Sequence, residues 1–262
     1  MKHETLVSEK ASGVWGYRKM RTVEIQAKSI LSKSRVYQWT INPYRGCQHG
    51  CSYCYARFMK RFSHHKESWG DFVDVKVNAP ELLTKEVKKK KVGRVWISGV
   101  CDPYQPVEEE YEITRRCLEV LQRNGWPVTI QTKSPLVLRD LNLLKDFGEI
   151  EVCFSIGTGN EEIRSTFEPR APCIEERINA LEILHREGIR TYVMIAPMLP
   201  KTESLPFQLQ GKVDHVVIDK MNYHYADWVY RKYRLEDARK NEFFAQKGTE
   251  LAHLFRMKGI RC

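Results

Sequence analysis

The chain has 262 residues, of which 42% are hydrophobic, a content that supplies a full core and excludes an intrinsically disordered protein. No apolar run approaches the roughly 20 residues needed to cross a bilayer, and residues 1–10 lack the apolar region of a secretory signal, so we expect a cytoplasmic protein without a membrane anchor. The formal net charge of +10 favours a polyanionic partner, of which nucleic acid is the obvious example.

Residues 1–35 read as a basic, weakly structured arm. After the arm, strand patterns and helix patterns alternate, with prolines and glycines at the expected helix ends. Six strands are predicted, at 36–41, 94–98, 128–132, 151–156, 190–196 and 215–218. Helices are predicted at 80–91, 110–123, 136–147 and 174–187, and a charged, aromatic helical region fills the remainder.

Regular alternation of strands and helices predicts an α/β fold with a parallel sheet and right-handed crossovers. Six units are fewer than the eight of a closed barrel, so we predict an open, partial (β/α)6 barrel. Functional residues of such folds lie at the carboxyl ends of the strands. Because no repeat or linker interrupts the pattern, residues 36–262 are expected to form one domain with a C-terminal helical extension.

A group of three cysteines follows the first predicted strand: Cys47, Cys51 and Cys54. Thiolates at this C-x3-C-x2-C spacing can converge on one iron–sulfur cluster, and the neighbouring glycines 46 and 50 allow the backbone to wrap closely around it. A [4Fe-4S] cluster takes four ligands, so three cysteines leave one iron open for a cofactor or substrate. The sequence therefore predicts a catalytic rather than a purely structural cluster.

A zinc site made of the three cysteines and His49 is the alternative interpretation of this loop. His49 lies inside the tight loop, where it is awkwardly placed as a ligand, and no second ligand pair follows at zinc-finger spacing. We expect His49 to be a hydrogen-bonding residue of the loop. The other five cysteines are scattered, and a disulfide framework belongs to small secreted chains.

The cysteine motif, with the aromatic Tyr53 before its last cysteine, resembles that of the radical SAM superfamily. The wider match over residues 42–57 resembles the branch that contains spore photoproduct lyase and its relatives, often called DNA repair photolyases. Further matches to this branch lie at residues 102–106, 132–134 and 168–172. The resemblance extends from about residue 25 to residue 220.

The resemblance implies an enzyme in which S-adenosylmethionine (SAM) binds the open iron of a [4Fe-4S] cluster through its amino and carboxylate groups. An electron from the cluster breaks the sulfonium–C5′ bond, and the 5′-deoxyadenosyl radical abstracts hydrogen from a substrate. A reductant such as flavodoxin or ferredoxin is implied as a partner. The positions that match the cofactor-binding residues of the family are Tyr53, Asp102, Lys133, Ser134 and Ser155.

Most of these cofactor positions also have a structural interpretation. Lys133 and Ser134 precede a proline and fit a helix N-cap turn, although a lysine at a strand end is a natural partner for a carboxylate. Asp102 before Pro103 fits an Asx turn, and Ser155 fits a small residue of the core.

Cys101 is the catalytic candidate. Spore photoproduct lyase uses a further cysteine near the end of the second strand to return a hydrogen atom, and Cys101 lies in the matching neighbourhood. The alternative is an inert, buried cysteine. In the 168–172 match, Glu168 and Arg170 are expected to form a loop salt bridge rather than to bind substrate.

An aromatic run follows the sixth strand and comprises Tyr223, Tyr225, Trp228, Tyr230 and Tyr233. Such rings can stack bases or line the substrate entrance. Helical spacing instead predicts that Tyr225, Trp228 and Val229 pack the last helix onto the barrel, and this is the interpretation we adopt for Trp228. Tyr223 and His224 remain open between the two.

Three functions compete on the sequence alone. The basic surface and the photolyase-like motifs favour a radical SAM enzyme, of lyase or modifying type, that acts on a nucleic-acid base. A radical SAM enzyme that acts on a small molecule or peptide is the second function. The third is a non-catalytic iron–sulfur or zinc protein, which the matching strand ends disfavour because a scaffold needs no SAM pocket.

Overall fold

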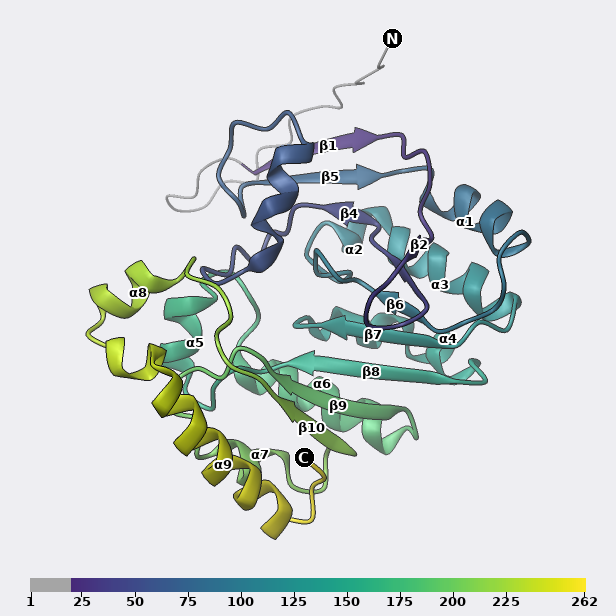
Figure 1. Ribbon diagram of the computed structural model, residues 1–262. Helices are drawn as coiled ribbons and strands as arrows, with labels where there is room; N and C mark the ends of the chain where they lie inside the picture. The colour runs from purple at the N-terminus through teal and green to yellow at the C-terminus, as the bar shows by residue number, and fades with distance from the viewer. Residues whose placement is uncertain (1–19) are drawn as a thin grey trace.

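Two β-sheets organise the computed structural model, which describes residues 20–262 (Figure 1). The large sheet has seven strands in the order β10-β9-β8-β7-β6-β3-β2. Their bounds are His215–Ile218 for β10, Arg190–Ile195 for β9, Ile150–Ser155 for β8, Val128–Thr132 for β7, Val95–Ile97 for β6, Trp39–Ile41 for β3 and Ser32–Lys33 for β2.

Six strands of the large sheet, β3 and β6 to β10, are parallel, and β2 pairs antiparallel with β3. Each of the six predicted strands is present, and their order in the sheet follows their order in the chain. β10 and β2 lie at opposite ends of this order, so the described strands form an open sheet. The predicted α/β fold with a partial, six-stranded parallel barrel is confirmed.

The parallel strands are short and rich in apolar and β-branched residues, which suits strands that are covered by helices and loops. Ile41, Ile97 and Ile130 are direct neighbours across β3, β6 and β7, and all three are fully buried. Phe154 on β8 and Ile195 on β9 continue the buried layer. Each such side chain stabilises the fold by about 1.5–3 kcal/mol relative to exposure.

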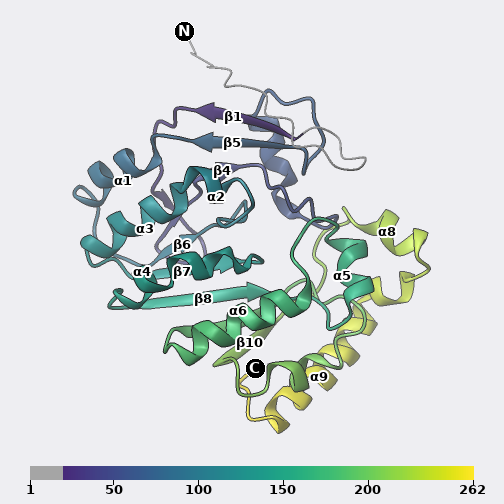
Figure 2. The same ribbon diagram turned by 180° about the vertical axis from the view of Figure 1, so that it is seen from behind.

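Helices cover one side of the large sheet, where Figure 2 shows α3, α4 and α6 in front of the strands. The helical elements before β10 are η1 (Tyr55–Phe62), α1 (Ala79–Val87), α2 (Glu108–Tyr111), α3 (Ile113–Arg123), η2 (Pro135–Asp140), α4 (Leu141–Lys145), α5 (Glu161–Phe167), α6 (Ile174–Arg186) and α7 (Leu205–Leu209). The single helix predicted at 136–147 is instead split into η2 and α4.

Helix α6 illustrates how local sequence sets these boundaries. The Cys173 thiol accepts a hydrogen bond from the Glu176 N–H at 3.4 Å, and the Glu176 carboxylate accepts one from the Cys173 N–H at 2.8 Å. This reciprocal cap satisfies two backbone donors at the start of the helix. Gly188, with φ of 81°, follows the last turn in the left-handed conformation that glycine adopts without strain.

A second, three-stranded sheet was not predicted from the sequence. It consists of β1 (Arg21–Ile25), β5 (Phe72–Lys76) and β4 (Tyr44–Arg45), in the order β1-β5-β4. β5 carries the buried Asp74 between apolar residues, and Asp74 is matched by Arg45 and His65 at 2.6 Å each. A charged residue inside a short strand interrupts the apolar pattern by which strands are predicted. The partners that neutralise Asp74 come from other parts of the chain, so the sequence does not reveal them.

Part of the predicted N-terminal arm is therefore ordered. Residues 20–35 contain β1, which pairs in parallel with β5, and β2 of the large sheet, so the expectation of weak structure is wrong for these residues. Residues 1–19 lie outside the described part of the chain. The division between an arm and a single domain at residue 36 stays a prediction.

The C-terminal extension is helical, as predicted, with α8 (Asp227–Lys232), η3 (Glu236–Arg239) and α9 (Asn241–Met257) beside the β10 edge (Figure 1). The prediction that Trp228 packs the last helix onto the barrel is wrong, because its side chain is 52% exposed. Ala226, Val229 and Tyr230 form the buried stripe that packs α8 against Phe167 and Leu199. Trp228 lies on the opposite side of this short helix. No helix among the described residues is long and apolar enough to cross a membrane.

Candidate active site

A cavity of ≈ 420 Å³ lies at the carboxyl ends of the parallel strands. Residues that follow five neighbouring strands line it: Cys101 and Asp102 after β6, Lys133 after β7, Ser155 on β8, Ala196 and Pro197 after β9, and residues 219–223 after β10. All three cysteines of the predicted cluster motif also line this cavity. The volume is typical of small-molecule sites.

The cysteine loop consists of two successive tight turns. The Gly50 N–H donates to the Cys47 carbonyl at 3.3 Å, and the Cys54 N–H donates to the Cys51 carbonyl at 3.2 Å. Gly50 has φ of 60°, and a Cβ atom there would lie 2.5 Å from the Arg170 guanidinium. The left-handed backbone of this turn therefore favours glycine at position 50.

The donor set of this loop suits an iron–sulfur cluster. Cys47, Cys51 and Cys54 are free, and Cys47 and Cys51 are buried. Thiolates are the preferred ligands of such clusters, and each binds its own iron atom. Among the described residues, no three His, Cys, Asp or Glu side chains are arranged to hold one single metal ion.

Asp102 holds the cysteine loop against the strand ends. Its carboxylate accepts hydrogen bonds from the Thr132 hydroxyl at 2.6 Å and from the backbone N–H of Lys133 at 2.7 Å and of Tyr104 at 2.9 Å. Nε2 of His49 lies 3.2 Å from the same carboxylate. Burial raises the pKa of Asp102, but these partners outweigh it and lower the pKa to about 2, so the carboxylate stays charged.

Gln105 makes a second connection between the 102–106 motif and the cysteine loop. Its fully buried side chain accepts from the Gln48 N–H at 2.9 Å and donates to the Gly46 carbonyl at 3.3 Å. The Gln48 amide oxygen in turn accepts from the Val107 N–H at 2.6 Å. The motif after β6 therefore fixes the position of the loop, in addition to the Asx turn that Asp102 forms.

A buried ion network lies beside the cysteines. Glu168 is 1% exposed, accepts a hydrogen bond from the Tyr53 hydroxyl, and pairs with Arg177 at 2.5 Å. Arg177 is fully buried and also donates to the Ser155 carbonyl at 2.9 Å. Nζ of Lys133 lies 3.9 Å from the Glu168 carboxylate.

The predicted salt bridge between Glu168 and Arg170 is wrong, although each residue does form an ion pair. Arg170 pairs with Asp71 at 3.1 Å, and Glu168 pairs with Arg177 and Lys133. The two side chains are only two positions apart in a loop and point to different partners. Sequence proximity was a poor guide because the partners come from elements distant in the chain.

Lys133 is a cation that lines the cavity beside the cysteine loop. Burial lowers its pKa, but Cys51 and Glu168 outweigh burial and raise it, so the ammonium group is charged at neutral pH. Nζ also lies 5.8 Å from the centre of the Tyr53 ring. One Glu168 carboxylate thus serves Arg177, Tyr53 and Lys133, and Lys133 retains capacity for a further anionic partner.

The remaining predicted cofactor residues are placed differently from one another. Tyr53 and Ser155 line the cavity, and the Ser155 hydroxyl accepts from the Gln131 amide at 3.2 Å. Ser134 is not among the lining residues, and its hydroxyl caps η2 by accepting from the Leu136 N–H at 3.2 Å. The catalytic candidate Cys101 lines the cavity and donates its S–H to the Ser98 hydroxyl at 3.2 Å.

Some residues of the site have no signal in the sequence. Arg177 lies in the first turn of α6, and a single arginine in a helix is normally an exposed residue. Tyr55 belongs to the matched segment 42–57, but nothing in the sequence assigned it a role, and it lines the cavity with Tyr223. Contacts between residues far apart in the chain, which the sequence does not reveal, bring these side chains to the site.

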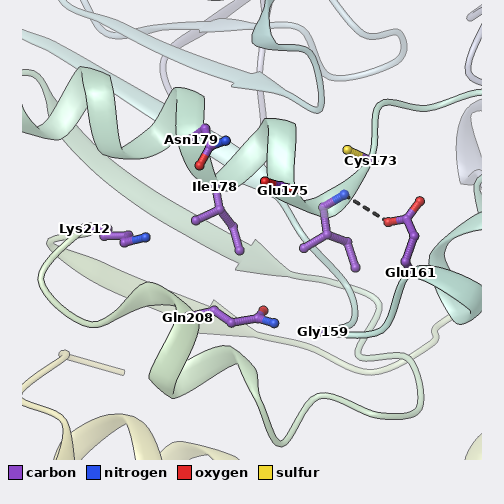
Figure 3. A pocket seen from close by; sticks show the side chains of 9 residues that line it. Gly159, Glu161, Cys173, Glu175, Ile178, Asn179, Gln208 and Lys212 are labelled. Carbon is purple, nitrogen blue, oxygen red and sulfur yellow. Dashed lines mark hydrogen bonds between the residues drawn. The ribbon is translucent and has the colours of Figure 1, made fainter.

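A second cavity, of ≈ 390 Å³, lies among α5, α6 and α7 (Figure 3). Cys173, Gln208 and Lys212 are among its lining residues. The Glu161 carboxylate at its edge accepts a hydrogen bond from the Ile174 N–H at 3.1 Å, and so is used in the fold. None of the cysteine-loop residues lines this cavity, which separates it from the candidate active site.

Comparison with known proteins agrees with the site. The model of the family described as the radical SAM superfamily matches residues 41–205. An uncharacterised protein of Methanocaldococcus jannaschii is 37% identical over 185 residues, which cover 70% of this chain and 69% of that protein. A protein of Pseudomonas phage M6 described as a radical SAM Nalpha-GlyT isomerase is 26% identical over 160 residues, which cover 60% of this chain and 32% of the phage protein.

Solved structures share the architecture. Spore photoproduct lyase complexed with dinucleoside spore photoproduct superposes with a TM-score of 0.66 at 15% sequence identity, over 95% of this chain and 84% of the lyase chain. At this identity the likeness shows the fold. The family match over residues 41–205, which include the cysteine loop and most of the strands, shows that this chain belongs to the radical SAM superfamily and is an enzyme.

Proposed function

We propose that this enzyme holds a [4Fe-4S] cluster on Cys47, Cys51 and Cys54 and binds SAM in the adjoining cavity. The observation that carries the proposal is that one cavity brings together the three free cysteines and polar residues from the ends of successive parallel strands. When bound, the cluster and SAM supply a 5′-deoxyadenosyl radical that abstracts hydrogen from a substrate.

Lys133 is proposed to bind the carboxylate of SAM. Its ammonium group is charged, faces the cavity, and has Glu168 as a distant partner at 3.9 Å, which leaves room for a closer charge-assisted hydrogen bond. Tyr53 and Ser155 are proposed to contact the rest of the cofactor from the cavity wall. Asp102 and Ser134 are proposed to support the site as positioning residues, because the fold already uses their oxygens.

Cys101 is proposed to return a hydrogen atom to the substrate radical, so that its S–H bond breaks, a C–H bond forms on the substrate, and the unpaired electron passes to the Cys101 sulfur. A donor needs an intact S–H bond, and burial raises the pKa of Cys101 to about 11, which keeps the thiol protonated at neutral pH. The thiol lines the same cavity as the cluster cysteines. These two properties fit a hydrogen-atom donor close to the place where the substrate reacts.

The proposed substrate is a nucleic-acid base. The net charge of +10 favours a polyanion, and a neighbour of the same fold was solved with a dinucleoside photoproduct bound. A reductant such as flavodoxin or ferredoxin is the proposed electron donor. All eight cysteines are free, which suits the reducing interior of the cytoplasm as the place of reaction.

Variants of the three loop cysteines test the proposal. After anaerobic reconstitution, the native protein is expected to hold about four iron and four sulfide atoms per chain. Cys47→Ala, Cys51→Ala and Cys54→Ala should each lose the cluster absorbance, whereas the control Cys262→Ala, at an exposed position, should keep it. Stoichiometric zinc without iron, or full iron in the loop variants, would refute the proposal.

A further inference from the structure

Three tyrosine rings and an arginine form a continuous stack at the entrance of the cavity. Tyr55 lies parallel to Tyr223, with ring centres 5.9 Å apart and planes 18° apart. Tyr223 lies parallel to Tyr225 at 6.0 Å and 14°. The Arg57 guanidinium lies 5.3 Å from the centre of the Tyr225 ring. We call these four residues the tyrosine ladder.

The ladder joins two segments that are far apart in the chain. Tyr55 and Arg57 belong to η1, directly after the cysteine loop, and Tyr223 and Tyr225 belong to the segment that leaves β10 and reaches toward η1 (Figure 1). Tyr55 and Tyr223 line the active-site cavity. The first two rungs therefore stand at the rim of the proposed radical site, and the others extend away from it.

The rings of the ladder are not core residues. Tyr55, Tyr223 and Tyr225 are 38%, 48% and 39% exposed, whereas Met221 and Ala226, on either side of the two tyrosines of the C-terminal segment, are buried and anchor that segment. Aromatic rings usually stabilise a fold by burial, and this segment buries its small and apolar residues instead. A stack of half-exposed parallel rings has the geometry of a platform for another planar group.

Basic residues are frequent in the two segments that form the ladder. η1 carries Arg57, Lys60 and Arg61 and no acidic residue, and α8 ends in Arg231 and Lys232. The acidic residue at the start of α8, Asp227, is already paired with Arg239 at 2.9 Å and with His224 at 2.8 Å. Arg57 also donates to the Ser52 carbonyl at 2.6 Å, which ties the end of the ladder to the cysteine loop.

We propose that the tyrosine ladder is the docking surface for unpaired bases of a single-stranded polynucleotide. The inference rests on the proposed function and specifies its substrate as an unpaired rather than a base-paired strand. Bases present a π-face only when they are unstacked from a duplex, and exposed rings in a cationic setting bind such strands by stacking with little regard to sequence. The surrounding lysines and arginines meet the phosphates.

The test measures affinity for three oligonucleotides of equal length: a single strand, the same backbone with abasic sites, and a blunt duplex. The native reconstituted protein, without reductant, should bind the single strand most tightly. Tyr223→Ala and Tyr225→Ala should weaken that binding roughly 5- to 100-fold, as expected from the loss of a base–ring stack, and should leave abasic binding unchanged.

Two control variants isolate stacking. Tyr223→Phe keeps the ring and should retain affinity. Tyr233→Ala removes a tyrosine of similar exposure, 47%, that stacks on no other ring among the described residues, and it should also retain affinity. The native protein should quench the fluorescence of a 2-aminopurine placed in the single strand, and the Tyr223→Ala variant should not.

Equal binding of the single strand and the abasic strand, a preference for duplex, or unchanged affinity in both ladder variants would each overturn this inference. These outcomes are distinct from a failure of the proposed function. The iron content of the same preparations reports the cluster, and loss of iron with the ladder effect intact would refute the cluster while keeping the docking surface. Iron present without a ladder effect would refute the docking surface alone.

Discussion

Lys133 is the residue whose surroundings bear most directly on cofactor binding. It is the cation among the described cavity-lining residues that lies next to the cysteine loop, with Glu168 3.9 Å away. A closer anion would gain a charge-assisted hydrogen bond in a site of low dielectric. The carboxylate of SAM is such an anion, and the proposed role of Lys133 is to link the ion network to it.

Lys133→Ala is expected to weaken SAM binding about 10- to 100-fold, as the loss of a hydrogen bond to a charged group implies. Iron content should stay unchanged, because the three cysteines are untouched. Isothermal titration of the reconstituted protein with SAM measures the affinity. Lys145→Ala, which removes a lysine from a surface ion pair with Glu187, is the control. If Lys133→Ala bound SAM as tightly as the native protein, Lys133 would be a residue of the turn without a role in SAM binding.

Residues differ in how far the sequence revealed them. The three cysteines were predictable because a loop of eight residues contains the whole motif. The supporting contacts were not predictable, because they join distant positions: Tyr53 meets Glu168 across 115 residues, and Gln48 meets Gln105 across 57. A local pattern thus predicted which cysteines line the cavity together, but it did not predict the distant residues that hold their loop in place.

At the scale of elements, Arg177 connects α6 to the strand edge that forms the site. Its guanidinium, fully buried, joins the Glu168 carboxylate, the Ser155 carbonyl at the end of β8 and the Pro172 carbonyl before α6. A buried carboxylate that loses its cationic partner keeps its desolvation cost without the compensating attraction. The position of α6 against β8 therefore depends on this side chain.

Arg177→Met is expected to lower the free energy of unfolding by about 3–5 kcal/mol, because it leaves Glu168 in the interior without its closest cation. Urea denaturation measures the change. The control is Arg186→Ala in the same helix, which removes a 74% exposed arginine. Its urea midpoint should equal that of the native protein. Equal effects of the two substitutions would contradict the structural role of Arg177.

The large sheet was predictable and the small one was not, for physical reasons. Strands covered on both faces are rich in apolar and β-branched residues, as in β6 to β9, and such segments stand out from the sequence. β4 has two residues, and β5 holds the buried Asp74, so neither forms such a segment. The split of 136–147 into η2 and α4, and the exposure of Trp228, likewise depend on packing that a single helix pattern does not record.

At the scale of the whole molecule, two groups of basic residues lie far apart. One group lies on η1 and α8 near the cavity, and another, Lys88, Lys89 and Lys91, follows α1. Both ribbon views place α1 and α8 on opposite sides of the molecule (Figures 1 and 2). Only the first group can meet the phosphates of a strand that reaches the cavity.

Arg61, Arg231 and Lys232, replaced together by alanine, should therefore flatten the salt dependence of single-strand binding. The log–log slope is expected to fall in magnitude by up to about 2 if each residue meets a phosphate. The matched triple variant of Lys88, Lys89 and Lys91 removes the same charge and should leave the slope unchanged. Fluorescence anisotropy at several salt concentrations measures both, and equal flattening would show binding without a defined face.

The central claim is that the cavity beside Cys47, Cys51 and Cys54 cleaves SAM reductively. Its most direct test is the quantification of 5′-deoxyadenosine by mass spectrometry after anaerobic incubation of the reconstituted protein with SAM and dithionite. We predict 5′-deoxyadenosine that requires both SAM and reductant and that is absent with Cys51→Ala. No 5′-deoxyadenosine from a protein with a complete cluster, or equal amounts from Cys51→Ala, would contradict the account.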